Sequence, residues 1–282
     1  MLSIGQRHIL ISSFFFALMN VCVKAINTLP THEIVFFRGL IALILCVVMM
    51  RRKKIPFWGT HRKLLITRGI AGTCALGLYF YTLREMPLAS AVTLGSLAPI
   101  FTTLLACVLV REYVPIKKLL FFFMAFVGVA LIKGFDPRIS PLELTLSIIA
   151  GLFAAIAYNM IRLLKDKEDP LTIILYFPLF TVPMVGSYTL WHWVWPTAFE
   201  WFLLLGVGIF VQIAQIYMTK GYQAETAANV AYLNYVGVLF ALFFGYSLFG
   251  EILGLASLLG ITLLIAGVLG ANQVREKSKI VS

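Results

Sequence analysis

The sequence predicts an all-α integral membrane protein of ten transmembrane helices, arranged as two inverted five-helix repeats. Hydrophobic residues make up 61% of the chain and charged residues only 12%, and the mean hydropathy is +0.94. Such values are not those of a soluble globular domain. Apolar segments of bilayer-spanning length fill nearly the whole chain, and one polar-interrupted stretch occurs twice. These three observations together predict the fold class.

Ten apolar segments follow one another, separated by short breaks rich in charge, proline or glycine. Each is close to the ~20 residues that cross a bilayer as a helix. The run after Arg7 and His8 is long enough to remain as a span, so it is not read as a signal peptide. The predicted spans are residues 8–27, 32–50, 65–84, 88–110, 115–133, 142–163, 170–190, 198–219, 226–249 and 252–272.

The distribution of basic residues predicts the orientation. With both termini in the cytoplasm, 18 of the 23 Lys and Arg residues lie in or beside inner segments, Arg68 among them. The other five, in or beside the outer half, are Lys24, Arg38, Arg84, Lys133 and Arg138. This bias follows the positive-inside rule, and aromatic residues at 191–195 fit the opposite interface. We therefore expect a multi-pass protein with cytoplasmic N and C termini.

Residues 87–112 recur, in pattern, at residues 226–251, with Glu112 falling on Glu251. Polar residues in steps of three stay on one side of a helix, and unpaired polar groups are costly in hydrocarbon. Two matched polar stripes therefore predict one shared interior, although the same side chains could simply join neighbouring helices. The stripes consist of Ser90, Thr93 and Ser96 in the first copy and Asn229, Tyr232 and Tyr235 in the second.

Five spans in each repeat is an odd number, so the second repeat enters the membrane upside down. Inverted repeats of this kind surround a midplane site, and rocking between them exposes that site to each side in turn. The predicted units are a first repeat at residues 1–134, a second at 141–273 and a basic cytoplasmic tail at 274–282.

Several short motifs occur in order along the spans: Lys24, the run Glu33–Arg38, Pro99, Glu112, Glu251 and the helix with Gly267. In this order the chain resembles the drug/metabolite transporter superfamily, specifically bacterial EamA-type ten-helix transporters, over nearly its whole length. Val238 departs from the pattern, which expects proline there. The resemblance implies a bacterial inner (plasma) membrane location and a central cavity lined by spans 1, 3, 4, 6, 8 and 9.

Candidate substrate-binding residues are the polar side chains expected to face that interior. Lys24 would present a cation to an anionic or zwitterionic substrate, or else extend to the membrane interface. Gln212 and Gln215 form a polar face that can bind a carboxylate or an amine, or bridge helices. The full set is Asn20, Lys24, Tyr79, Ser90, Thr93, Ser96, Tyr158, Asn159, Gln212, Gln215, Asn229, Tyr232 and Tyr235.

Within this set, Asn229 and Tyr232 are expected to contribute most to substrate binding, because both carry hydrogen-bonding groups in the second stripe. Arg38 is expected to tie helices together, and Arg162 to lie at the interface. Pro178 and Pro183 fall within the seventh span, where a tolerated kink is favoured over a broken helix.

These features predict a secondary transporter, an exporter or exchanger of small polar metabolites such as amino acids or related compounds, working by alternating access. The alternative is a non-transporting membrane scaffold. The sequence contains no catalytic motif, and its four cysteines and four histidines lack metal-ligand spacing, so we expect no enzyme, no metal and no cofactor. The net charge of +11 follows the topology, so the expected partners are a small-molecule substrate and the lipid bilayer, not nucleic acid. The sequence leaves open whether the protein forms a homodimer.

Overall fold

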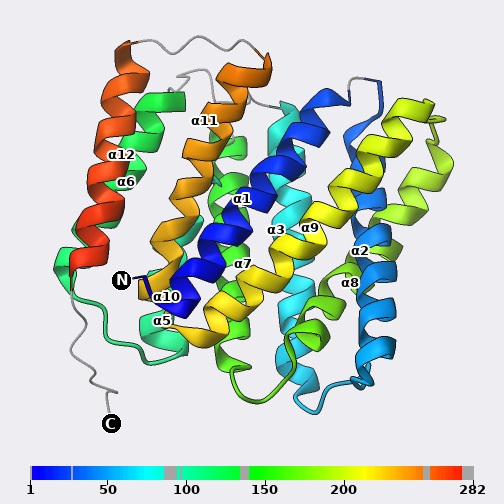
Figure 1. The fold of residues 1–282 in the computed structure, drawn as a ribbon, viewed down its shortest axis with the longest axis horizontal. Helices are drawn as coiled ribbons and strands as arrows, with labels where there is room; N and C mark the ends of the chain where they lie inside the picture. Colours follow the sequence, from blue (N-terminus) through cyan, green and yellow to red (C-terminus); the bar gives the residue numbers. More distant parts are fainter. Residues whose placement is uncertain are drawn as a thin grey trace.

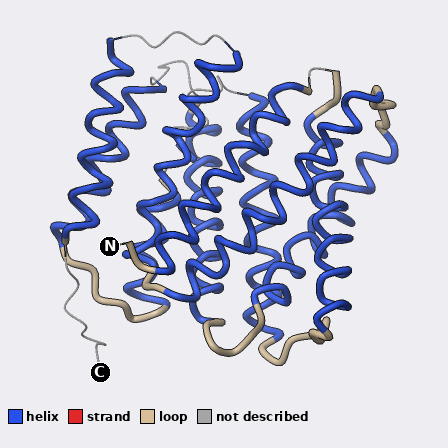
Figure 2. Tube along the Cα trace, viewed as in Figure 1, coloured by secondary structure: helices blue, strands red, loops and turns tan. Residues whose placement is uncertain are grey.

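The computed structural model describes residues 2–26, 28–85, 94–95, 97–133, 140–249 and 255–274. The regular elements in these ranges are all helical (Figure 1 and Figure 2). They are α1 (Ile4–Ala25), α2 (Thr31–Lys53), α3 (Arg62–Glu85), α5 (Ala98–Leu109), α6 (Ile116–Lys133), α7 (Pro141–Leu163), α8 (Pro170–Trp191), α9 (Ala198–Ala224), α10 (Ala227–Val230), the 3₁₀ helix η1 (Ala231–Tyr235), α11 (Val236–Phe249) and α12 (Leu255–Gln273).

The apolar composition produces helices of membrane-spanning length. In the part of the chain that the structure describes, six helical segments are long and apolar enough to cross a bilayer. They are α1, α2, α7, α8, α9 and the segment Ala227–Leu248. The predicted all-helical membrane class is thereby confirmed.

Local sequence signals explain where several helices begin. α1 and α7 start with the same capping box, in which Ser3 pairs with Gln6 and Ser140 with Glu143. In each box the hydroxyl accepts a hydrogen bond from a first-turn N–H, and the side chain three residues on caps the serine N–H. Proline opens both α7 and α8, where its missing N–H costs nothing. Pro178 and Pro183 do not break α8, as expected.

The helices pack mainly between the two halves of the chain. α1 packs most extensively on α9, and α7 on α3, while α2 faces α8 and α6 faces α12 (Figure 1). α11 adds to the α1 contact and α5 to the α7 contact. Each half therefore relies on the other to cover its helices.

α6 and α12 approach each other closely at glycines. A Cβ atom on Gly128 would lie 2.6 Å from the Gly260 carbonyl oxygen, and one on Gly267 would lie 2.7 Å from the Ala125 nitrogen. Small residues at such crossings let two backbones meet in a membrane, where close packing stabilises helix pairs.

The predicted ninth span, residues 226–249, is not one continuous α-helix. A short α10 is followed by the 3₁₀ turn η1 and only then by α11. The Gln6 side-chain nitrogen donates to the Asn229 carbonyl oxygen at 3.4 Å, beside the change of helix type. A side chain that bonds to a backbone carbonyl is a known cause of such breaks, and 3₁₀ segments within a span often mark hinges.

Candidate functional site

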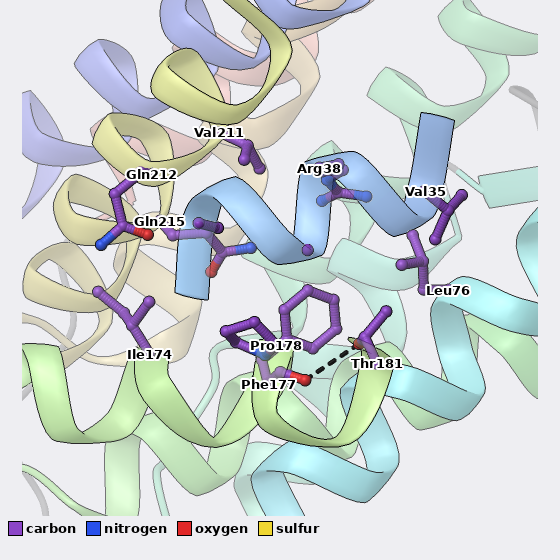
Figure 3. Close-up of a pocket in the computed structure, with 12 residues that line it drawn as sticks. Val35, Arg38, Leu76, Ile174, Phe177, Pro178, Thr181, Val211, Gln212 and Gln215 are labelled. Carbon is purple, nitrogen blue, oxygen red and sulfur yellow. Dashed lines mark hydrogen bonds between the residues drawn. The ribbon is translucent and has the colours of Figure 1, made fainter. Parts of the chain in front are cut away.

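A small cavity lies between α2, α3, α8 and α9 (Figure 3). Its volume of about 10 Å³ is room for about one water molecule. The structure is therefore closed around this point, without space for a metabolite. The lining residues are Val35, Arg38, Gly39, Ala42, Leu76, Ile174, Phe177, Pro178, Thr181, Val211, Gln212 and Gln215.

Two arginines lie on one aromatic ring of this cavity, that of Phe177. Arg38 lines it from α2, and Arg68 on α3 is only 2% exposed. Their guanidinium carbons lie 6.0 Å and 5.4 Å from the centre of the Phe177 ring, within the range of cation–π contacts. The Nε atom of each is buried without a hydrogen-bond partner, and neither arginine pairs with a carboxylate of the described residues. Two positive charges thus share one aromatic ring and lack counter-ions in the described part.

Two glutamines on α9 add side-chain amides to the same cavity. Gln215 accepts a hydrogen bond from Arg68 Nη2 at 3.4 Å through its Oε1 atom. Gln212 is 2% exposed and lies beside the Cys46 thiol, and within the described ranges neither its oxygen nor its nitrogen makes a hydrogen bond of ordinary geometry. An unpaired buried amide is unfavourable, so Gln212 is a group that a bound molecule would satisfy. Figure 3 shows both side chains projecting from α9 toward the space above α8.

Tyrosines extend this polar region toward α7 and η1. Tyr158 lies within electrostatic range of both Arg38 and Arg68, and its ring stacks on that of Tyr222 at 5.1 Å. The Tyr222 hydroxyl in turn accepts a hydrogen bond from Asn234 Nδ2 at 3.0 Å. Tyr79 lies within electrostatic range of Arg38. The arginines are therefore surrounded by aromatic rings with polar tips.

Four predicted site residues thus come to this region, and three others on α1 and α7 do not. Gln212 and Gln215 line the cavity, and Tyr79 and Tyr158 lie near its arginines. Asn159 is fully buried, and its Nδ2 atom donates to the Thr102 and Ala155 carbonyl oxygens at 3.0 Å and 2.9 Å, which ties α7 to α5. Asn20 and Lys24 are exposed on α1 and are not among the lining residues.

The second polar stripe forms a hydrogen-bonded network at the end of the bundle where α1 begins and α12 ends, here called the terminal end. Lys118 Nζ donates to Asn229 Oδ1 at 2.5 Å. The Tyr232 hydroxyl accepts from Gln6 Nε2 at 3.0 Å and donates to Asn272 Oδ1 at 2.8 Å.

The structure describes one further stripe residue, Tyr235, and it is not among the residues that line the cavity. Tyr235, 1% exposed, is also buried away from it, although it too was predicted to bind substrate. Ser90, Thr93 and Ser96 lie outside the described residues. In the described part, Asn229 and Tyr232 of the predicted second stripe therefore join helices at the terminal end.

A second contact at the terminal end involves Glu112, one of the motif residues. Its Oε1 atom pairs with Arg162 Nε at 2.6 Å, and its Oε2 atom accepts from the Ala227 N–H at 2.8 Å. Arg162 also donates to the Gln223 carbonyl oxygen at 3.2 Å. One carboxylate thus connects α7 and the start of α10, where the positive end of a helix favours negative charge.

Other features make weaker candidates for a site. A wider groove of about 420 Å³ between α3 and α8 is lined by Trp58, Arg62, Ile66, Tyr176, Leu179 and Phe180, and contains no buried unpaired group. Across the described ranges, His, Cys, Asp and Glu do not gather in threes that could hold a metal ion.

Two residues near the cavity, Arg68 and Phe177, were not among the predicted site residues. The sequence assigns Arg68 to the inner basic residues and offers no signal for Phe177. The expectation that Arg38 ties helices together agrees with its contact with Phe177, which joins α2 to α8. The available signal was position, since Arg68 lies six residues inside a span-length helix, and intramembrane charges are usually functional. The cavity also involves α2 and α8, the second and seventh predicted spans, which the family resemblance did not include.

Comparison with known proteins also indicates a membrane transporter. The EamA-like transporter family matches residues 4–134 and again 142–273. The chain belongs to this family. It is therefore a multi-pass membrane transporter of the drug/metabolite transporter superfamily, as the order of motifs predicted.

Individual relatives match over most of their length. The pseudopaline exporter CntI of Pseudomonas aeruginosa PAO1 is 29% identical over 280 residues, which covers 98% of both chains. An uncharacterized transporter of Helicobacter pylori 26695 is 28% identical, with 93% of this chain and 92% of that protein covered. Mouse solute carrier family 35 member G1 is 25% identical, covering 88% and 73%. A solved crystal structure aligns with a TM-score of 0.84 at 14% identity, covering 96% and 97%, which establishes the fold alone.

Proposed function

We propose that the protein is a secondary exporter of small polar metabolites, such as amino acids or related compounds, which binds them at the cavity between α2, α3, α8 and α9. The observation that carries this proposal is Gln212, whose amide is buried in the cavity beside the Cys46 thiol, with neither polar atom in a hydrogen bond of ordinary geometry in the described part. Burying such a group costs free energy that a bound polar molecule would recover. Arg38 and Arg68, whose Nε atoms are buried beside it without a hydrogen-bond partner in the described part, likewise favour a polar ligand.

Alternating access between two inverted repeats is supported by the helix contacts. If α1–α6 and α7–α12 are equivalent halves, the α1 contact with α9 becomes the α7 contact with α3. The α2–α8 and α6–α12 pairs map onto themselves. Two repeats related by a two-fold axis in the membrane plane would give this pattern, with the site between them. The cavity of about 10 Å³ then corresponds to a closed intermediate that opens to each side in turn.

Export is proposed as the direction because the pseudopaline exporter matches over nearly the full length of both chains. The competing scaffold function is supported by Asn159 and Asn229, whose polar groups bond to other helices. The two functions differ in what Gln212 does. A scaffold uses it only for packing, whereas an exporter uses it to bind substrate.

The test replaces Gln212 with methionine, which keeps the side-chain length and removes both polar atoms. Proteoliposomes are loaded with a bacterial metabolite extract, and the released compounds are identified by mass spectrometry. We expect Gln212→Met to lower release of the transported compound by about tenfold or more, while the melting temperature stays equal or rises, because an unpaired buried group has been removed. Gln273→Met, at the exposed end of α12, is the matched control.

Two results would contradict the proposal. Release by Gln212→Met at the wild-type rate would remove the cavity as the binding site. No protein-dependent release of any compound, combined with a lower melting temperature of Gln212→Met, would favour the scaffold.

A further inference from the structure

Resting on the proposed function, we propose that the transported compound is an organic anion whose carboxylate group is held by Arg38 and Arg68. The structure describes two arginine side chains with buried, unpaired Nε atoms at the cavity and no carboxylate paired with either. A buried charge without a partner is strongly unfavourable, and a substrate carboxylate is the partner that the described residues do not provide.

The two guanidinium groups lie near one aromatic ring. The guanidinium carbon of Arg38 lies 6.0 Å from the centre of the Phe177 ring, and that of Arg68 lies 5.4 Å from it. Both arginines are also within electrostatic range of Tyr158. The planar fork of an arginine donates two parallel hydrogen bonds to a carboxylate. One arginine on α2 and one on α3 therefore each offer such a fork beside the same ring, to one carboxylate or to two carboxylates of one compound.

The rest of the lining selects against cations. Of the described residues that line the cavity, none is acidic, so an ammonium group would meet two positive charges without a compensating carboxylate. Gln212 and Gln215 offer amides, which accept or donate hydrogen bonds but carry no charge. The Gln215 side-chain oxygen accepts a hydrogen bond from Arg68 at 3.4 Å, and a substrate oxygen would take the same position relative to Arg68. The site therefore favours compounds with net negative charge over neutral ones, and neutral ones over cations.

The first experiment compares five-carbon compounds of similar size and different charge. Proteoliposomes containing the full-length protein are loaded with equal amounts of glutarate, glutamate, glutamine and ornithine, together with glycerol 3-phosphate as a phosphate-bearing anion. We expect release to follow the order glutarate or glutamate, then glutamine, then ornithine. Arg38→Gln and Arg68→Gln should each slow release of the anions by about tenfold or more, whereas Arg62→Gln, an exposed arginine on the same helix α3, should not.

The second experiment supplies the missing counter-ion inside the protein. Gln215→Glu places a carboxylate within bonding distance of Arg68 at nearly unchanged shape. The variant should have a higher melting temperature than the wild type and should lose most anion release, because its own carboxylate competes with the substrate. This result does not depend on whether the arginine variants fold.

Each other outcome counts against the inference. Preferred release of glutamine or ornithine, release of glycerol 3-phosphate without either carboxylate anion, or unchanged anion release by both Arg68→Gln and Gln215→Glu would overturn it. A neutral or cationic compound released in a Gln212-dependent way would overturn the inference and leave the proposed export function standing. Failure of every compound in a whole-cell extract to be released would instead remove the proposed function.

Discussion

The crossing of α6 and α12 gives a prediction whose size can be worked from the structure. In Gly128→Ala the new Cβ would lie 2.6 Å from both the Gly260 carbonyl oxygen and the Leu264 nitrogen. Ordinary van der Waals contact begins near 3.4 Å, so the two backbones must move apart by about 1 Å. Overpacking of this kind costs about 1–3 kcal/mol. Against this, alanine is favoured over glycine within a helix by about 1 kcal/mol.

Gly77→Ala on α3 isolates the second effect, because a Cβ there would meet nothing within 4 Å. We expect Gly77→Ala to be neutral or slightly stabilising, and Gly128→Ala to unfold at a temperature roughly 2–12 °C below it. The assay is thermal unfolding of purified protein in detergent, followed by size-exclusion chromatography. Equal melting temperatures for the two alanine variants would refute the close backbone contact between α6 and α12.

Three further predictions concern the terminal end. Glu112→Gln keeps an oxygen for the Ala227 N–H but removes the charge that pairs with Arg162 in a largely buried place. The free energy of unfolding should therefore fall by about 3–5 kcal/mol, and an unchanged denaturation midpoint would contradict the pairing. Burial raises the pKa of Glu168, but hydrogen bonds to its carboxylate lower that pKa more, so it lies below its ordinary value of 4.5. The donors are the His61 N–H at 2.6 Å and the Thr60 hydroxyl at 2.9 Å. Because the folded-state pKa is depressed, this stabilisation is present above pH 4.5 and is lost as the pH falls below it, and Glu168→Gln should flatten the pH dependence of the melting temperature in that range. In a cysteine-free background, Lys63→Cys should react with a membrane-impermeant reagent only from the cytoplasmic side; reaction from outside intact cells would reverse the orientation.

Helix positions could be predicted from the sequence because apolar length sets them directly. The predicted span 170–190 corresponds to α8 at Pro170–Trp191, and the predicted 115–133 to α6 at Ile116–Lys133. The break at η1 could not be predicted, because it involves Gln6, which lies more than 200 residues earlier in the chain. Such contacts between distant segments are invisible to patterns of local hydropathy.

The candidate site was predictable only where spacing revealed a face. Gln212 and Gln215 were found because steps of three keep polar groups on one side of a helix. Spacing could not show that the Asn229 side chain is bonded to Lys118 on a distant helix. Arg68 was not predicted as a site residue, because a basic residue near the inner end of a span is also explained by the positive-inside rule. Which polar group has a partner within the protein is decided by tertiary packing, and that decides which one is left for a ligand.

The most direct measurement of the central claim is the accessibility of the cavity from each side of the membrane. Ala42 lines the cavity and is small, so Ala42→Cys in a background without the four native cysteines places a single thiol at the site. A membrane-impermeant maleimide is applied to right-side-out and to inside-out vesicles, with and without the transported compound. Alternating access at this site predicts labelling in both preparations, slowed in each by the compound. Labelling from one side only, or from neither, would contradict it.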